Sequence, residues 1–371
     1  MNKIGILTFH ITENYGAMLQ AFALLTVINR NGGDAVIINY PLKSNKIPFF
    51  KFISHQIWMI VRFFLGNRIR KKRAIQFREN YLKLKGIPLV RDIVNDKNVK
   101  ALEKYVVGSD QVWNMSITED SAYRLDFVDA KKGKYSYAAS IGSVSFNDNQ
   151  KKIFKKSLST FRAVSLRESS SIPMLKDLNI DSVSVLDPTL LLNKEDWINE
   201  LSLSCTSKRK YLFCYVLPGN ATNRFTINLA KKIAKEKGWG IVIIGAREYM
   251  SLFSSIYCTT AGPKEFVEYV YNAEFVVTNS FHGTCFSINF GKNFYSVISS
   301  KSKRSNRTKD LLSSLGLENC CVSDINDNLE NISNVTFDYP YQKLAELRNL
   351  SIDFVKRIVE DRYFDKMSPF I

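Results

Sequence analysis

The chain has 371 residues, of which 45% are apolar and 23% are charged, a composition that is ordinary for globular proteins. This composition excludes a disordered, collagenous or low-complexity chain, and at about 150 residues per domain the length indicates two domains. Lysine and arginine outnumber aspartate and glutamate by 52 to 35, which gives a net charge of +17. Such an excess predicts an anionic partner: a nucleic acid, a membrane surface or a phosphorylated substrate.

The N-terminal sequence MNKIGILTFH lacks the apolar core and the cleavage site of a signal peptide. No run of about 18 uninterrupted apolar residues occurs, so no transmembrane helix is predicted. The six cysteines include no C-x-x-C pair and the three histidines no H-E-x-x-H motif, so we expect free thiols and no metal site. These features together predict a cytoplasmic protein.

The first forty residues predict a βαβ unit of a parallel sheet. Residues 3–9 form a short apolar run typical of a buried strand, and residues 17–30 predict a helix that ends at Gly32 and Gly33. Residues 35–40 predict the next strand. The same pattern of short apolar runs predicts further strands at residues 105–108, 135–139, 163–166 and 182–186.

A polar segment at residues 193–210 separates this half from a second series of strands and helices. Its strands are predicted at residues 211–216, 240–244, 275–278 and 294–298, and its helices at 221–237 and 263–272. The fold class is therefore α/β, with two Rossmann-like domains facing across a cleft. We place the domains at residues 1–195 and 205–335, followed by a helical segment at 340–371 that can pack back on the N-terminal domain.

Much of the positive charge lies in one excursion of the N-terminal domain, residues 43–85. This segment holds twelve lysines and arginines and one acid, Glu79, among many aromatic and aliphatic residues. A basic amphipathic helix of this type can lie on the inner face of an anionic membrane. The alternative is a solvated helical excursion that packs its apolar side on its own domain.

A polar turn, TNSFHGT at residues 278–284, follows a predicted strand and precedes a predicted helix at 285–290. His282 thus lies where free N–H groups and a partial positive charge suit a phosphate or a carboxylate, and histidine exchanges protons near neutral pH. We predict a functional role for His282, with Ser280, Gly283 and Thr284 beside it. The alternative is a structural histidine held within the turn. His10, at the end of the first strand, is a weaker candidate.

Cations follow two other predicted strands. Arg304 and Arg307 lie in a loop after residues 294–298, where guanidinium groups can bind a phosphate bidentately. The alternative is a solvated loop. Arg167 follows residues 163–166 and precedes Glu168; it can clamp a carboxylate or form a structural pair with that glutamate.

Two polar segments of the first half are candidates for binding a sugar. Asn14, Tyr15 and Gly16 open the first helix, and Gln20 lies in its first turns. The loop GSDQVWN at residues 108–114 places Asp110, Gln111 and Trp113 after a predicted strand. Carboxylate, amide and indole groups together can hold a sugar, whereas the alternative is a helix cap with a packed indole. No G-x-G-x-x-G or P-loop motif occurs.

Taken in order, these motifs resemble those of the polysaccharide pyruvyl transferase family over nearly the whole chain. The segments that carry the resemblance are ITENYGAMLQAFAL (11–24), VVGSDQVWN (106–114), YAASIG (137–142), SLRE (165–168), VLDPTLLL (185–192), GPKEFVEYVYNAEFVVTNSFHGTCFSINF (262–290) and RSNRTKDLLSSLGL (304–317). The resemblance implies a GT-B-like arrangement with an N-terminal acceptor domain and a C-terminal donor domain. It also implies transfer of the pyruvyl group of phosphoenolpyruvate to two hydroxyls of a sugar in a capsular or other cell-surface polysaccharide precursor.

By this resemblance, Arg167 and His282 are the catalytic, donor-binding positions, and no cofactor is expected. Arg304, Arg307, Ser280, Gly283 and Thr284 would complete the donor site. The acceptor, which can be lipid-linked, would face Asn14, Tyr15, Gly16, Gln20, Asp110, Gln111 and Trp113. Family members often read R-L-H where this chain reads Ser280-Phe281-His282, so Arg304 or Arg307 would have to supply the cation. Asn279 stands where aspartate is common.

Two other functions fit the sequence. A GT-B glycosyltransferase that uses a nucleotide sugar would need the same two domains. A basic protein that binds nucleic acid or a membrane would explain the charge, but the chain contains no recognised nucleic-acid module. We therefore expect phosphoenolpyruvate and a saccharide as partners and no nucleic acid. Residues 43–85 can in addition contact a membrane.

Overall fold

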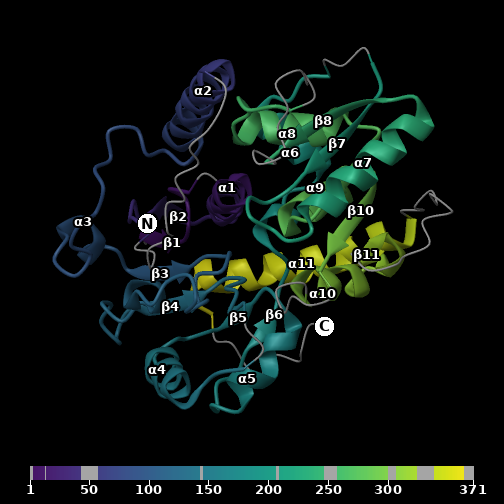
Figure 1. Cartoon of the computed structure of the whole chain (residues 1–371). Coiled ribbons are helices and arrows are strands. Elements are labelled where there is room, and N and C mark those ends of the chain that lie inside the picture. The colour runs from purple at the N-terminus through teal and green to yellow at the C-terminus, as the bar shows by residue number, and fades with distance from the viewer. Residues whose placement is uncertain are drawn as a thin grey trace. The chain divides into compact units, whose positions relative to one another are not determined.

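The computed structural model describes residues 3–12, 14–42, 57–142, 145–205, 209–245, 257–299, 306–323 and 338–362 (Figure 1). Contacts between Cα atoms divide the chain into two compact units. Unit 1 consists of Met1–Pro48, Arg78–Leu192 and Lys343–Ile371, and unit 2 of Phe49–Phe77 and Asn193–Gln342. Each unit is built on parallel strands with helices around them, as the α/β prediction requires.

Within the described residues, unit 1 contains six short strands. They are β1 (Lys3–Leu7), β2 (Asp34–Ile37), β3 (Lys104–Val107), β4 (Gly133–Ser136), β5 (Ser165–Leu166) and β6 (Val183–Ser184). Its helical segments are α1 (Tyr15–Arg30), α3 (Lys97–Lys100), η1 (Ser121–Arg124), α4 (Asp148–Leu158), η2 (Ser169–Ser171), α5 (Ile172–Lys176), η3 (Pro188–Leu190) and most of α11 (Asp338–Glu360).

The main sheet of unit 1 has the order β2-β1-β3-β4, and all its pairings are parallel. Strands β3 and β4 are buried along their whole length, which explains the apolar runs in the sequence. The chain moves from β1 to β2 on one side and later returns to β3 on the other. The strand order therefore reverses between β1 and β3, where α/β sheets bind ligands at the carboxyl ends of the strands.

Helix α11, drawn in yellow in Figure 1, packs against unit 1. The Lys104 ammonium donates to the carbonyl oxygens of Ile358 (3.1 Å) and Val359 (2.6 Å) at the end of this helix. A cation is favoured there because the last carbonyl groups of a helix carry partial negative charge. The ring of Tyr137 meets that of Phe354 edge to face. The C-terminal helix thus completes the core of the first unit.

In the part of unit 2 that the structure describes, five parallel strands form a sheet of order β11-β10-β9-β7-β8. Its strands are β7 (Tyr211–Tyr215), β8 (Gly240–Ile244), β9 (Phe275–Thr278), β10 (Asn293–Ile298) and β11 (Cys321–Ser323). Its helices are most of α2 (Ile57–Tyr81), α6 (Lys194–Leu201), α7 (Asn223–Lys237), α8 (Pro263–Asn272), α9 (Phe281–Asn289) and α10 (Asn306–Ser314), with the 3-10 helix η6 (Glu318–Cys320). Here the strand order reverses between β7 and β9.

The unit boundaries differ from the predicted domains in one respect. The basic excursion was predicted as part of the N-terminal domain, whereas residues 49–77 group with unit 2. The physical reason is a set of contacts between α2 and residues at the start of α8: Arg73 donates to the Thr260 carbonyl before this helix (3.0 Å) and pairs with Glu265 in its first turn (3.1 Å). Residues 43–56 of the excursion lie outside the described residues. Among the helices that the structure describes, none is long and apolar enough to cross a membrane.

Candidate functional site

In unit 1, buried polar groups gather where the strand order reverses. Thr8, just after β1, donates to the Ser109 carbonyl just after β3 (2.7 Å). Gln20 of α1 donates its amide to the Thr8 hydroxyl (2.8 Å), and its carbonyl oxygen is buried without a hydrogen-bond partner among the described residues. Side-chain hydrogen bonds thus join the carboxyl ends of β1 and β3. Asp110 is the next residue of the chain after Ser109.

Asp110 adopts a left-handed backbone conformation with φ of +75°. The left-handed conformation is energetically unfavourable for every residue except glycine. Residues held in it are often found at functional sites. One carboxylate oxygen of Asp110 accepts from the backbone N–H of Gln111 (2.8 Å), and no hydrogen bond is formed by the other within the described part of the chain. Asp110 is 7% exposed. A carboxylate held in this way can accept a hydrogen bond from a hydroxyl group.

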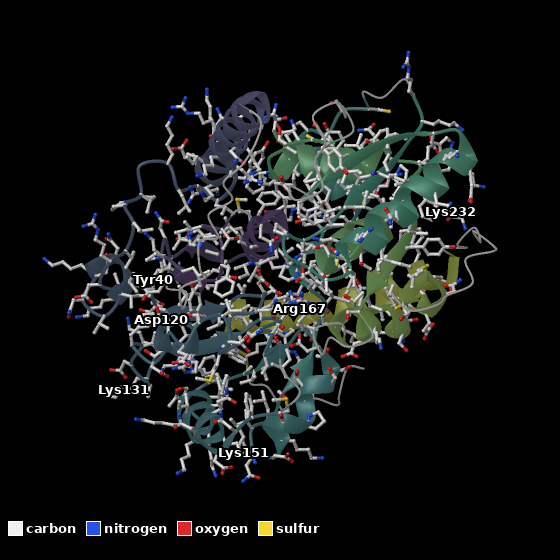
Figure 2. The ribbon with its side chains drawn as sticks, viewed as in Figure 1. Tyr40, Asp120, Lys131, Lys151, Arg167 and Lys232 are labelled. Carbon is white, nitrogen blue, oxygen red and sulfur yellow. The ribbon has the colours of Figure 1, made fainter. Side chains whose placement is uncertain are left out.

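Arg167, which is labelled in Figure 2, is buried in unit 1 and contacts two carboxylates. Its side chain is 1% exposed and contacts Asp187 (Nη1 to Oδ2, 3.2 Å) and Glu168 (Nε to Oε2, 3.8 Å). Burial favours the neutral guanidine, but the charges of Asp187, Glu168 and Asp110 outweigh this effect and raise the pKa of Arg167. The structural pairing that the sequence left open is the arrangement observed.

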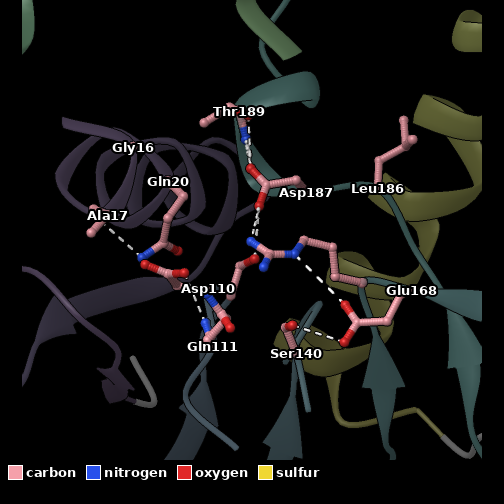
Figure 3. A network of polar contacts seen from close by, with 12 residues as sticks. Gly16, Ala17, Gln20, Asp110, Gln111, Ser140, Glu168, Leu186, Asp187 and Thr189 are labelled. Atoms are coloured by element: carbon pink, nitrogen blue, oxygen red, sulfur yellow. Dashed lines mark hydrogen bonds and ion pairs between the residues drawn. The ribbon is translucent and has the colours of Figure 1, made fainter. Parts of the chain in front are cut away.

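Other hydrogen bonds fix the two carboxylates that contact Arg167 (Figure 3). Asp187 accepts from the hydroxyl of Ser109 (2.8 Å) and from the backbone and hydroxyl groups of Thr189 (3.0 and 2.7 Å). One oxygen of Glu168 accepts from the Ser140 hydroxyl (2.8 Å) and from the backbone N–H groups of residues 141 and 142 (3.0 and 3.2 Å). Through Asp187 and Glu168, Arg167 at the end of β5 is therefore connected to the residues that follow β3 and β4.

In unit 2, the TNSFHGT turn forms the start of α9. The helix begins at Phe281, four residues earlier than predicted, because the Ser280 hydroxyl caps it by accepting from the Gly283 N–H (3.4 Å). A Cβ atom on Gly283 would lie 2.4 Å from the Thr278 hydroxyl, so glycine allows α9 to approach β9 closely. Thr284 is buried and bonds to Ser296 of β10 (2.7 Å). Ser280, Gly283 and Thr284 thus build the turn that positions His282.

His282 lies in the first turn of α9, and Phe281 of the same turn contacts both His282 and Arg307 of α10. The ring of Phe281 joins the two residues, since it meets the imidazole edge to face at 5.4 Å and carries the Arg307 guanidinium on its face at 5.6 Å. Phe281 therefore contacts both an imidazole and a guanidinium at the N-terminus of α9, and these are groups suited to an anion. Arg304, the other predicted cation, lies outside the described residues.

Asn279 links the two strand ends between which the order of this sheet reverses. Its carbonyl oxygen accepts from the Leu217 N–H (2.9 Å), and its amide donates to Thr222 (3.0 Å) and Asn223 (2.7 Å). An aspartate at this position cannot make the two donated bonds while it is ionised. The amide therefore suits the loop that follows β7 in this chain.

The remaining predicted acceptor residues make contacts within unit 1. Asn14 caps α1 by accepting from the Gly16 N–H (3.0 Å), and Tyr15 is buried in the first turn of the helix. Gln111 is partly exposed and accepts from Asn114 (2.8 Å). The expected sugar platform at Trp113 is not formed: the indole packs in the core and donates to the Tyr123 carbonyl (2.8 Å), as the packed alternative predicts.

Sequence reasoning did not single out Ser109, Asp187 or Thr189. The order Asp-Pro-Thr signals the capped 3-10 helix that begins at Pro188. However, the second oxygen of Asp187 reaches partners 20 and 78 positions away in the chain, and no local pattern contains such distances. Among the described residues, no group of three or more His, Cys, Asp or Glu side chains is placed to hold a metal ion.

Solved structures resemble this chain over its whole length at low sequence identity. A putative UDP-N-acetylglucosamine 2-epimerase from Listeria monocytogenes is 9% identical, with 100% of this chain and 99% of that chain covered and a TM-score of 0.52. A UDP-N-acetylglucosamine 2-epimerase from Methanocaldococcus jannaschii is 12% identical, with 95% and 93% covered and a TM-score of 0.46. The likeness to the Listeria protein confirms the fold of two Rossmann-like, GT-B-like units. It carries no statement about activity.

No curated protein matches the sequence. The model of one protein family, described as polysaccharide pyruvyl transferase, matches residues 14–302. The match includes Asp110, Arg167 and His282 and spans most of both units. The chain therefore belongs to the polysaccharide pyruvyl transferase family.

Proposed function

We propose that the protein transfers the pyruvyl group of phosphoenolpyruvate to two hydroxyls of a sugar, in a precursor of a capsular or other cell-surface polysaccharide. The products are a cyclic pyruvate ketal and inorganic phosphate. Family membership supports the reaction class. The observation that carries the donor assignment is the cluster of His282, Phe281 and Arg307 at the start of α9.

Unit 2 would bind phosphoenolpyruvate, which carries a phosphate and a carboxylate. Arg307 is partly exposed, and the Phe281 ring holds its guanidinium in place, so less conformational freedom is lost when an anion binds. The helix N-terminus adds partial positive charge. Arg307 would thus supply the cation that position 280 lacks in this chain.

Unit 1 would bind the acceptor sugar through Asp110. One Asp110 oxygen is held by the Gln111 N–H, and the other accepts no hydrogen bond within the described residues. That oxygen is suited to receive a sugar hydroxyl and then its proton. Arg167 would position Asp110 through its charge, acting from within unit 1 and without touching the donor.

The proposed reaction balances in protons and bonds. C3 of phosphoenolpyruvate gains a proton and becomes a methyl group, and a first sugar hydroxyl bonds to C2 and gives up its proton. The bond between C2 and the phosphate oxygen then breaks. The second hydroxyl closes the ketal, and its proton leaves with the phosphate. His282 would serve as the proton donor to C3, and the scheme itself requires no cofactor.

The test is an assay of the purified full chain with phosphoenolpyruvate and a panel of lipid-linked and model glycosides. We expect phosphate release together with a mass gain of one pyruvate less one water on an acceptor. His282→Ala should lower the rate by about 10²-fold or more, the usual contribution of a general acid or base. An absence of the mass gain across the panel would count against the proposal, and a full rate in His282→Ala would remove this residue from the mechanism.

A nucleotide-sugar glycosyltransferase is the alternative that the fold admits, since the Listeria structure of similar fold is named as acting on a UDP-sugar. Ligand-induced stabilisation separates the two functions. At about 100 times its Kd, a ligand adds about 2.7 kcal/mol to the free energy of unfolding. We expect phosphoenolpyruvate to raise the melting temperature and UDP-N-acetylglucosamine to leave it unchanged; the reverse result would favour the glycosyltransferase.

A further inference from the structure

One face of α2 brings both cations and large apolar side chains to the surface. The structure describes the side chains of this helix from Gly66 onward. With about 3.6 residues per turn, five of the exposed residues on one contiguous side of the helix are cations or isoleucines. They are Arg68, Ile69, Lys71, Lys72 and Ile75, which we call the α2 outer face. The two isoleucines are 43% and 44% exposed.

The opposite face of α2 is packed against unit 2, so the outer face has a fixed orientation. A Cβ atom on Gly66 would lie 2.2 Å from the Thr259 hydroxyl, which shows how closely the helix approaches this unit. Arg73, on the same inner side, bonds to the Thr260 carbonyl (3.0 Å) and pairs with Glu265 (3.1 Å). These contacts leave the outer face as the side of α2 that a partner can reach.

Exposed apolar side chains cluster in this part of the chain. Of the eight large apolar residues that are exposed within the described residues, five lie between positions 69 and 94. They are Ile69, Ile75, Ile87, Leu89 and Val94. Residues 68–94 also contain nine lysines and arginines and only two acids. Ile69 and Ile75 belong to unit 2 and the other three to unit 1, so the two isoleucines are the members that lie on the α2 outer face.

We propose that the α2 outer face docks on an anionic lipid surface. Cations on the face attract anionic headgroups, and the isoleucines gain by entering the boundary between headgroups and acyl chains. A nucleic acid backbone offers the cations an equal attraction but gives the isoleucines no apolar partner. The inference does not depend on the proposed reaction.

The experiment is cosedimentation of the full chain with vesicles, one set of pure phosphatidylcholine and one containing phosphatidylglycerol. We expect binding to the second set alone, weakened by salt. Arg68→Ala/Lys71→Ala/Lys72→Ala should weaken this binding about ten-fold or more. Ile69→Ser/Ile75→Ser keeps every charge and should also weaken it several-fold, because the apolar contribution is lost.

The matched control is Lys151→Ala/Lys155→Ala/Lys156→Ala on α4, which removes the same charge from an exposed helix without exposed large apolar residues (Figure 2 labels Lys151). This variant should bind vesicles about as well as the natural chain. Equal losses in both triple variants would show a response to net charge and overturn the proposal. Binding to duplex DNA with none to either vesicle set, or unchanged binding of the isoleucine variant, would overturn it as well.

Discussion

Two arginines that both looked suited to an anionic substrate have different surroundings. Arg167 is enclosed in unit 1 and is balanced by Asp187 and Glu168. Arg307 is partly exposed on the face of an aromatic ring in unit 2. A buried, paired guanidinium stabilises its neighbours, whereas a partly exposed one can exchange water for a ligand at small cost. Burial therefore separates a positioning residue from a ligand-binding residue, although both are arginines after a strand.

Removing the Arg307 guanidinium should weaken donor binding. We expect Arg307→Met to raise the KM for phosphoenolpyruvate by about ten-fold or more, because a charge-assisted hydrogen bond contributes about 1.5–3 kcal/mol. Steady-state kinetics with varied phosphoenolpyruvate measure this effect. Lys309→Met removes the same charge from an exposed position two residues along α10 and is the control. Equal KM values in the two variants would contradict a donor contact by Arg307.

Replacing Asp110 should separate function from stability. Asp110→Gly removes the carboxylate but tolerates the left-handed backbone, so the free energy of unfolding should stay within about 1 kcal/mol of the natural value. Activity should fall by about 10²-fold or more, as for the loss of a general base. Asp110→Asn should lose activity to a similar extent. Urea unfolding and initial rates give both quantities.

Ala138 offers the matched control, since it has φ of +52° and lies just beyond β4 in the same unit. Ala138→Gly should likewise leave stability within about 1 kcal/mol but should retain activity. If Asp110→Gly and Ala138→Gly keep the same activity, Asp110 is a turn residue alone. If Asp110→Gly unfolds the protein, its carboxylate is structural.

At the scale of elements, the described strands except β11 could be predicted, as could helices α1, α7, α8 and α11, because apolar runs and caps are local signals. Helices α4, α6 and α10 were not predicted. The βαβ start of unit 1 and the strand before the TNSFHGT turn lie close to their predicted ranges. The beginning of α9 was predicted four residues late, since Phe281 and His282 read as turn residues until the Ser280 cap is seen. The packing of Trp113 and the cluster around Arg167 join distant segments, which no local pattern contains.

The close approach of α9 to β9 makes a prediction for Gly283. An alanine here would place its Cβ 2.4 Å from the Thr278 hydroxyl and 3.1 Å from that residue's Cβ, so the helix or the strand must shift. We expect a loss of about 1–3 kcal/mol in the free energy of unfolding, as for other overpacked sites. Urea unfolding followed by circular dichroism measures this change.

Gly240 serves as the control in the same unit. The nearest atoms to a Cβ at that position lie at 3.6 Å, an ordinary contact distance. Gly240→Ala should therefore change stability by no more than about 0.5 kcal/mol, as at other sites free of special features. Similar losses in the free energy of unfolding at both positions would mean that the close contact between α9 and β9 does not require glycine at position 283.

At the scale of the whole molecule, the cations behind the net charge of +17 lie in different surroundings. Arg167 is paired with buried carboxylates inside unit 1, whereas Arg307 is the cation that we propose binds the donor. The α2 outer face holds three more cations beside exposed isoleucines. A single sum of charges pointed first to nucleic acid, whereas the positions of the charges favour an anionic small molecule and a lipid surface.

The proposed division of labour between the units predicts where each ligand slows amide exchange. Phosphoenolpyruvate alone should slow hydrogen exchange in residues 278–289 and 306–314 of unit 2, because ordering the start of α9 and the Arg307 side chain lowers local opening. A glycoside acceptor alone should slow exchange at residues 107–112 of unit 1, around Asp110. Mass spectrometry of peptic fragments of the full chain resolves these segments. Protection by phosphoenolpyruvate confined to residues 165–168 would instead move the donor to Arg167 and reverse the assignment of the two units.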